Sequence, residues 1–232
     1  MNPLRVRSRA SGSMTAWAFF LVAFASVAGA FYVLRYRGLW IDQDTSLMTV
    51  LIENVRREGT LSPSAGKAYG FGYAYQAVTA FILEVAGLSV QQLQVIIWPL
   101  VAAPALALTA FSFFDQAARD RRTAALAALL LFFQGDLVFT ILRGSHEKLD
   151  WPLMMVALML LIRGSSRALP GLLRHVFLFY LTVFAMMATN IFFASTLVVA
   201  IVLSLFLGVL VEVLLHRRLA VAGDLRRLLW VA

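Results

Sequence analysis

The stretch VFLFYLTVFAMMATNIFFASTLVVAIVLSLFLGVLVEVLL, residues 176–215, decides the fold class. It is apolar almost throughout and is about twice as long as one helix needs to cross a bilayer. Thr189 and Asn190 are the most polar pair inside it, so we predict two membrane-spanning helices that meet there. Further apolar runs precede it at residues 16–34, 73–88, 93–114, 123–142 and 151–162. The sequence therefore predicts an all-α, polytopic transmembrane helix bundle.

The composition excludes several classes of protein. Of the 232 residues, 61% are hydrophobic and 14% are charged, which is outside the range of ordinary soluble domains. The longest polar stretch, residues 35–72, is too short for an independent domain, so we expect one membrane module over residues 1–232. The net charge of +8 comes from clusters beside the apolar runs, which excludes nucleic acid as a partner. Because cysteine is absent, disulfides, thiolate catalysis and cysteine-ligated metals are excluded.

The basic clusters predict the topology. They lie at residues 5–9, 119–122, 163–174 and 217–227, and arginines beside spans favour the cytoplasmic side. All four reach one side only if residues 73–88 form an interfacial or re-entrant helix in an outer loop at residues 35–92. If residues 73–88 cross the membrane instead, the next outer loop moves inside. The predicted spans are then residues 16–34, 93–114, 123–142, 151–163, 174–188 and 191–215. Residues 28–30 resemble a signal-peptidase site, but we interpret the first span as an uncleaved anchor, because it continues to Leu34.

The first outer loop contains WIDQDTSLMTVLIENVRREG, residues 40–59, with Asp42 and Asp44 directly before an amphipathic pattern. Apolar residues recur at helical spacing from residue 45 to 58, and Gly59 is a good helix stop, so we predict a helix lying in the interface. Asp44 also suits the N-cap of this helix, which is an alternative to a catalytic role. Asp42 has no capping role there, which favours a function for it.

The second outer loop reads RGSHEKLDWP, residues 143–152, and is dense in groups that bind polar ligands. Its alternative interpretation is a solvated turn in which Asp150 caps the helix that Pro152 opens. Two acidic loops on one membrane face can together build one site. Asp136 lies within a predicted span, where a carboxylate is either functional or paired with Arg143 two turns further along.

The order of these parts resembles the N-terminal half of the GT-C class of membrane glycosyltransferases, which includes aminoarabinose transferases and protein mannosyltransferases. The resemblance covers residues 16–162. Asp44 matches the family's first aspartate by its distance to Gly59, Asp42 gives a DxD-like pair, and Asp150 matches the second-loop aspartate. Thr45 stands where many members have glutamate, and YGFGYAY at residues 69–75 replaces a proline-rich segment. Members are longer, so we expect this chain to be part of a longer enzyme.

The resemblance implies transfer of a sugar from a polyprenyl-phosphate donor to a glycan, lipid or protein acceptor, with inversion at the anomeric carbon. The reaction would take place at the extracytoplasmic face of a plasma membrane, as expected for a bacterial protein. The implied catalytic residues are Asp44, Asp42 and Asp150, and the implied substrate-binding residues are Arg143, His146, Glu147, Lys148 and Tyr73. A metal-dependent reaction would use Mg²⁺ or Mn²⁺ held by Asp42, Asp44 and Glu147. The alternative is a non-catalytic membrane subunit or a transporter, with Asp136, Arg143 and Glu84 along a polar path.

Overall fold

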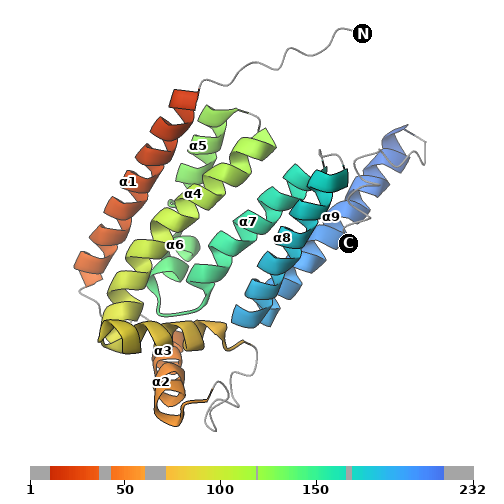
Figure 1. Ribbon diagram of the computed structural model, residues 1–232. Helices are drawn as coiled ribbons and strands as arrows, with labels where there is room; N and C mark the ends of the chain where they lie inside the picture. Colours follow the sequence, from red (N-terminus) through yellow and green to blue (C-terminus); the bar gives the residue numbers. More distant parts are fainter. Residues whose placement is uncertain (1–10, 37–42, 61–71, 119, 166–168, 217–232) are drawn as a thin grey trace.

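The computed structural model describes residues 11–36, 43–60, 72–118, 120–165 and 169–216, and the regular structure in these ranges is entirely helical. Figure 1 shows the arrangement of the helices. The elements are α1 (Ser11–Tyr36), α2 (Gln43–Glu58), α3 (Ala74–Ala86), the π-helical turn η2 (Gln92–Ile97), α4 (Trp98–Ala118), α5 (Arg121–Leu131), α6 (Gly135–Leu142), α7 (Glu147–Ser165), α8 (Leu169–Thr189) and α9 (Ile191–His216).

Four helices among the described residues are long and apolar enough to cross a membrane, which indicates a membrane protein. They are Met14–Tyr36, Gln92–Ala118, Gly171–Thr189 and Ile191–Val211. The last two meet at Asn190, where the sequence predicted the break. α7 is not among the four, since its 19 residues carry charges at both ends: Glu147, Lys148 and Asp150 in the first turn and Arg163 in the last.

Residues 123–142 form two helices and not the one straight helix that we expected. The axes of α5 and α6 differ in direction by 69°. If this bent pair is counted as one span, it is the fifth candidate among the described residues. At the bend, the backbone N–H groups of Phe132, Phe133 and Gln134 bond to carbonyls three residues earlier. This tightened turn ends α5 and satisfies backbone groups that would be costly to expose in lipid.

α4 is the central helix and contacts α1, α5, α6 and α7 (Figure 1). The face of α4 within the core is built from Ala102, Ala103, Leu106, Ala107 and Ala110, all of which are buried. These mostly small side chains let neighbouring helices approach α4 closely. A second core cluster joins α7, α8 and the start of α9.

The amphipathic helix predicted in the first loop is α2. Its residues Met48, Leu51, Ile52 and Val55 are buried together with residues of α3, and the helix ends at Gly59 with a positive φ of 65°. α3 ends in the same manner at Gly87, which has a φ of 64°. α3 lies across one end of the long helices and not alongside them (Figure 1).

The long helices therefore have two chemically different ends. One end, called the loop end below, carries α2, α3, the connection at residues 143–146 and the α8–α9 break (Figure 1). The opposite end carries the α4–α5 and α7–α8 connections, beside which the arginines of two predicted clusters lie. Both acidic loops thus share one end of the described structure, and α3 does not separate them.

Candidate functional site

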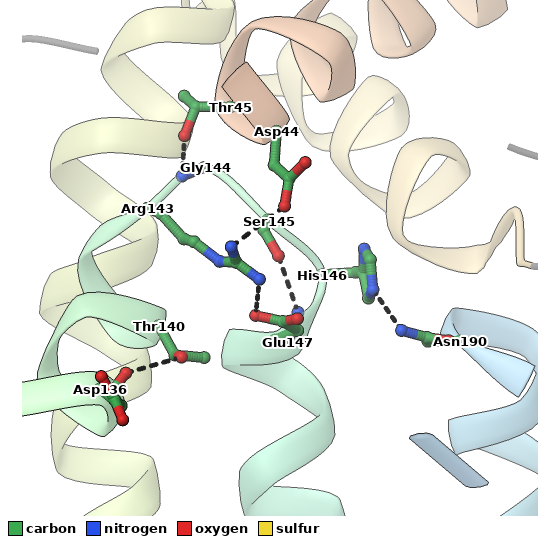
Figure 2. Close-up of polar contacts among 10 residues, drawn as sticks. All are labelled: Asp44, Thr45, Asp136, Thr140, Arg143, Gly144, Ser145, His146, Glu147 and Asn190. Carbon is green, nitrogen blue, oxygen red and sulfur yellow. Dashed lines mark hydrogen bonds and ion pairs between the residues drawn. The ribbon is translucent and has the colours of Figure 1, made fainter. Parts of the chain in front are cut away.

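Arg143 joins the two loops at the loop end. Its Nη1 atom lies 3.0 Å from Oδ2 of Asp44, and its Nη2 atom donates to Oε2 of Glu147 (Figure 2). The guanidinium also lies 5.6 Å from the ring centroid of Phe139, within the range of a cation–π contact. The side chains of Asp44, Arg143 and Glu147, called the Arg143 cluster below, are the polar groups that the two loops bring together.

Asp44 is the most accessible member of this cluster, with 45% of its side chain exposed against 16% for Arg143 and 23% for Glu147. The N-cap alternative for Asp44 is wrong, because α2 already begins at Gln43. Asp44 lies in the first helical turn, where the free N–H groups and the helix dipole favour a carboxylate. An exposed carboxylate held by an arginine can meet a substrate without first being uncovered.

Gly144 lets the second loop approach α2 and η2. Its N–H donates to Oγ1 of Thr45 at 2.8 Å. A Cβ at this position would lie 2.6 Å from Oε1 of Gln94 and 2.6 Å from Cγ2 of Thr45, closer than real Cβ contacts. Glycine is therefore required by the close approach of three segments. Nothing local in the sequence distinguishes this glycine from an ordinary loop glycine.

Lys148 was expected to bind substrate, but it is fully buried and its Nζ donates to the carbonyl of Gln94 at 3.0 Å. The π-helical turn explains this contact. Within η2 the N–H of Trp98 bonds to the carbonyl of Leu93, so the corresponding donor for Gln94 would be residue 99. That residue is Pro99, which has no N–H. Lys148 therefore satisfies a backbone carbonyl that the helix leaves open.

His146 is also buried, with 2% of its surface exposed, and it contacts the α8–α9 break. Its Nε2 atom faces the side-chain amide nitrogen of Asn190 (Figure 2). The ring of Tyr75 from α3 packs edge-on against it, with centroids 6.5 Å apart. Burial, and then the nearby Arg143, lower the pKa of His146 to about 4. Sequence reasoning used Asn190 only as a helix break and missed this contact.

Asp150 is fully buried in the first turn of α7, and neither carboxylate oxygen accepts a hydrogen bond from the described residues. Burial, and then the charge of Glu147, raise its pKa to about 8. The N-cap alternative for Asp150 is wrong, because α7 begins at Glu147, three residues earlier. Buried Asp150 is not placed to contact a substrate that approaches the exposed side of the Arg143 cluster.

The remaining predicted residues lie elsewhere. Tyr73 is the partly buried N-cap residue of α3, and Asp42 lies outside the described residues. The expected pair between Asp136 and Arg143 is not formed, since Arg143 binds Asp44 and Glu147 instead. Asp136 is exposed at the start of α6. Glu84 is exposed and pairs with Arg56 at 2.7 Å.

The described residues do not fit a divalent cation. They include no group of three or more His, Cys, Asp or Glu side chains that could hold a metal. Asp44 and Glu147 both engage the Arg143 guanidinium, which supplies the positive charge between them. Metal ligation by these two carboxylates would require Arg143 to leave.

An apolar cleft of about 350 Å³ adjoins the Arg143 cluster. It lies between the end of α1 and the bent α5–α6 pair, and its lining residues are Tyr32, Tyr36, Phe132, Phe133, Gly135, Val138, Phe139 and Leu142. Phe139 belongs to both features, because its ring also lies beneath the Arg143 guanidinium. The bend between α5 and α6 shapes this cleft, and the sequence patterns did not predict it.

No protein family, curated protein or solved structure with which we compared the chain matches it. The functional argument therefore depends on the residues of the site and on their geometry.

Proposed function

We propose that this chain is the membrane-embedded part of a glycosyltransferase that transfers a sugar from a polyprenyl-phosphate donor. The observation that carries the proposal is the bridge from Arg143 to Asp44 of the first loop and Glu147 of the second. It pairs a partly exposed carboxylate with a guanidinium that has donors for a phosphate. Inverting sugar transfer needs a base for the acceptor and a cation for the leaving phosphate.

The proposed topology puts the loop end at the outer face of the membrane. The arginine-rich connections lie at the opposite end and would be cytoplasmic. The bent α5–α6 pair and residues 151–163 of α7 would complete six spans. α2 and α3 would lie in the outer interface. Val78, Phe81 and Val85 of α3 are exposed apolar residues that suit this position.

The cleft beside the cluster suits the hydrocarbon part of such a donor. Its walls are aromatic and aliphatic, so a chain entering it would lose contact only with lipid. Arg143 follows Leu142 of the cleft directly, so a phosphate on that chain would meet the guanidinium. The polar head and the apolar tail of one molecule would thus reach adjacent parts of the site.

In the proposed reaction, Asp44 accepts the proton of the acceptor hydroxyl while the hydroxyl oxygen forms a bond to the anomeric carbon. The bond between that carbon and the phosphate oxygen breaks, and the polyprenyl phosphate leaves with the bonding electrons. Arg143 neutralises the leaving phosphate, and Glu147 keeps the guanidinium in position. Because Asp150, Lys148 and His146 are buried, this proposal assigns them positioning roles.

The test is a transfer assay on the full chain in proteoliposomes. Polyprenyl-phosphate mannose and aminoarabinose are the donor probes, total membrane lipid is the acceptor, and the released polyprenyl phosphate is measured. Asp44→Asn should lower the rate by about 10²- to 10⁴-fold, as expected for loss of a general base. Asp136→Asn makes the same chemical change at an exposed carboxylate outside the cluster and should keep the rate. Full activity in Asp44→Asn would remove Asp44 from the mechanism, and an equal loss in Asp136→Asn would show that the effect is not specific to the Arg143 cluster.

A further inference from the structure

A continuous chain of polar contacts connects the start of α9 to the loop that carries Arg143. Oδ1 of Asn190 accepts from the backbone N–H of Phe192 at 3.0 Å and more weakly from that of Phe193 at 3.4 Å, which makes Asn190 the N-cap of α9. The other end of the same amide, Nδ2, faces Nε2 of His146 (Figure 2). His146 lies in one short loop with Arg143, which it follows by three residues.

The cap fixes the chemistry of the contact with His146. Because Oδ1 of Asn190 is committed to the helix, only the N–H₂ group can face the imidazole. Nε2 of His146 must then accept, so the ring is neutral and carries its proton on Nδ1. Protonation of His146 would place two donors opposite each other. Rotating the Asn190 amide would relieve this conflict only by breaking the cap of α9.

From this geometry we propose that Asn190 is a positioning residue, which acts through neutral His146 to hold the loop of Arg143 and Glu147 against the α8–α9 break. Movement of α9 at this break and the placement of the Arg143 cluster are then coupled. The inference goes beyond the proposed reaction and does not depend on it, because it concerns where the loop is held and not what the loop catalyses.

The surroundings of His146 offer no easy replacement for this contact. The charged groups in and after its own loop are Arg143, Glu147, Lys148 and, one turn into α7, Asp150. Arg143 opposes a positive imidazole, Glu147 is committed to Arg143, and Lys148 donates to Gln94. α3 brings only the phenol of Tyr75, and residues 185–195 around the break contain no titratable side chain. Protonation of His146 would therefore add a second positive charge beside Arg143 in buried surroundings, which favours release of the loop.

The test measures the distance between α9 and α2, the helix that contacts the loop. The chain has no cysteine, so Ser46→Cys on α2 and Ser195→Cys on α9 can each carry one spin label. Both sites are exposed, and α2 is joined to the loop through Arg143 and Gly144. The distance distribution between the two labels is recorded by pulsed electron paramagnetic resonance, on the full chain in nanodiscs, from pH 8 to pH 4. We expect one narrow distribution at pH 8 that broadens as the pH falls from about 6.5 toward 4, because a released imidazole has a pKa near 6.5.

Three variants separate the bridge from the cap. Asn190→Ser keeps a good N-cap but loses the amide, so its distribution should be broad at every pH. His146→Gln can still accept from Asn190 and cannot be protonated, so it should keep the narrow distribution to lower pH than the parent. Asn190→Asp keeps the cap and attracts a protonated imidazole, so it should also stay narrow as the pH falls. The proposal is overturned if Asn190→Ser matches the parent, or if the parent, His146→Gln and Asn190→Asp broaden at the same pH.

Discussion

Arg143 and Asp44 pair at 3.0 Å although 99 residues separate them in the chain. No local pattern can create this contact, because it depends on α2, α6 and α7 packing at the same end of the helices. Most of the Arg143 side chain is buried, whereas almost half of Asp44 remains exposed. The pair therefore has an anchored partner and an accessible one, which is the asymmetry that a binding site needs.

Replacing Arg143 with lysine should weaken the cluster although the charge is kept. The guanidinium reaches Asp44 with one nitrogen and Glu147 with the other, and a single ammonium group does not reproduce this fork. We expect Arg143→Lys to lower the free energy of unfolding by about 1 kcal/mol. Arg56→Lys, at a partly exposed arginine that also meets two glutamates, is the matched control and should change little. Thermal unfolding in detergent measures both, and equal effects would contradict the bridging role of Arg143.

Alanine at Gly144 should destabilise the loop end. The new methyl group would press on Gln94 and Thr45, at a cost of about 1–3 kcal/mol for overpacking. Gly135→Ala adds the same group where no atom lies within 4 Å, at the first residue of α6, and should be neutral or stabilising by about 0.4–1 kcal/mol. A melting temperature that falls for Gly144→Ala and not for Gly135→Ala would support the close approach. Unchanged stability in Gly144→Ala would show that the three segments are farther apart in solution.

The contact between Lys148 and Gln94 predicts that a second substitution can restore stability that is lost when Lys148 is replaced. Lys148→Met removes the donor to the Gln94 carbonyl and should cost about 1–3 kcal/mol. Pro99→Ala supplies a backbone N–H at the position where the π-helical turn lacks one. The double variant should therefore recover part of the loss, which a double-mutant cycle of unfolding free energies can measure. Strictly additive effects would mean that Lys148 is buried for another reason.

Asp150 predicts how stability changes with pH. Its pKa is about 8 in the folded protein and near its ordinary value of 3.8 in the unfolded chain. Between these values the folded state binds a proton that the unfolded state lacks, so the contribution of Asp150 to stability falls as the pH rises from about 4 to 8. Asp150→Asn stays neutral and should remove this fall. Since 1 kcal/mol shifts the melting temperature by roughly 2–4 °C at this chain length, the variant should melt above the parent by much more at pH 8.5 than at pH 5. If the melting temperatures of the parent and of Asp150→Asn changed in parallel with pH, this would contradict a buried Asp150 carboxyl with a raised pKa.

Cysteine labelling in intact cells tests the proposed topology. Single cysteines at Ser46 and Thr60, which are exposed at the loop end, should react with an impermeant maleimide. A cysteine at Thr123, which is exposed at the opposite end, should react only after permeabilisation. Ser145 is a poor reporter, since only 1% of its surface is exposed. Labelling of Thr123 from outside would reverse the orientation, and labelling of Ser46 and Thr123 on one side would contradict the bundle.

Helix positions and ends were largely predictable from local chemistry. The α8–α9 break follows from Thr189 and Asn190 in an otherwise apolar run, and the end of α2 follows from Gly59. Such features depend on a few neighbouring residues, so the sequence states them directly. The starts of α2 and α7 were less predictable. Asp44 and Asp150 resemble N-cap residues in the sequence, but both lie within the first turn of their helices.

The roles of the second-loop residues could not be predicted, because burial depends on tertiary packing. Lys148, His146 and Asp150 look like ligand-binding groups in sequence, yet each is buried. The need for Lys148 arises from a π-helical turn and a proline about fifty residues earlier in the chain. The bend between α5 and α6, and with it the apolar cleft, was missed because residues 123–142 were interpreted as one apolar run, although Gln134, Gly135 and Asp136 interrupt it near the bend. Arg143, Asp44 and Glu147 were among the predicted site residues, but that they contact one another became visible only in the structure.

The close packing of Gly72 against the end of α8 has a consequence for the order in which the protein is made. A Cβ on Gly72 would lie 2.2 Å from the carbonyl oxygen of Thr189, so Gly72, two residues before α3, rests directly on backbone synthesised much later. Translation must therefore proceed past Thr189 before α3 can dock in its final position. Until then the nascent chain already contains Asp44 and Arg143, but it lacks Thr189 and Asn190, which Gly72 and His146 contact. Completion of the loop end is thus a late event in biogenesis, and ribosome-bound intermediates that stop before α8 should lack these two contacts.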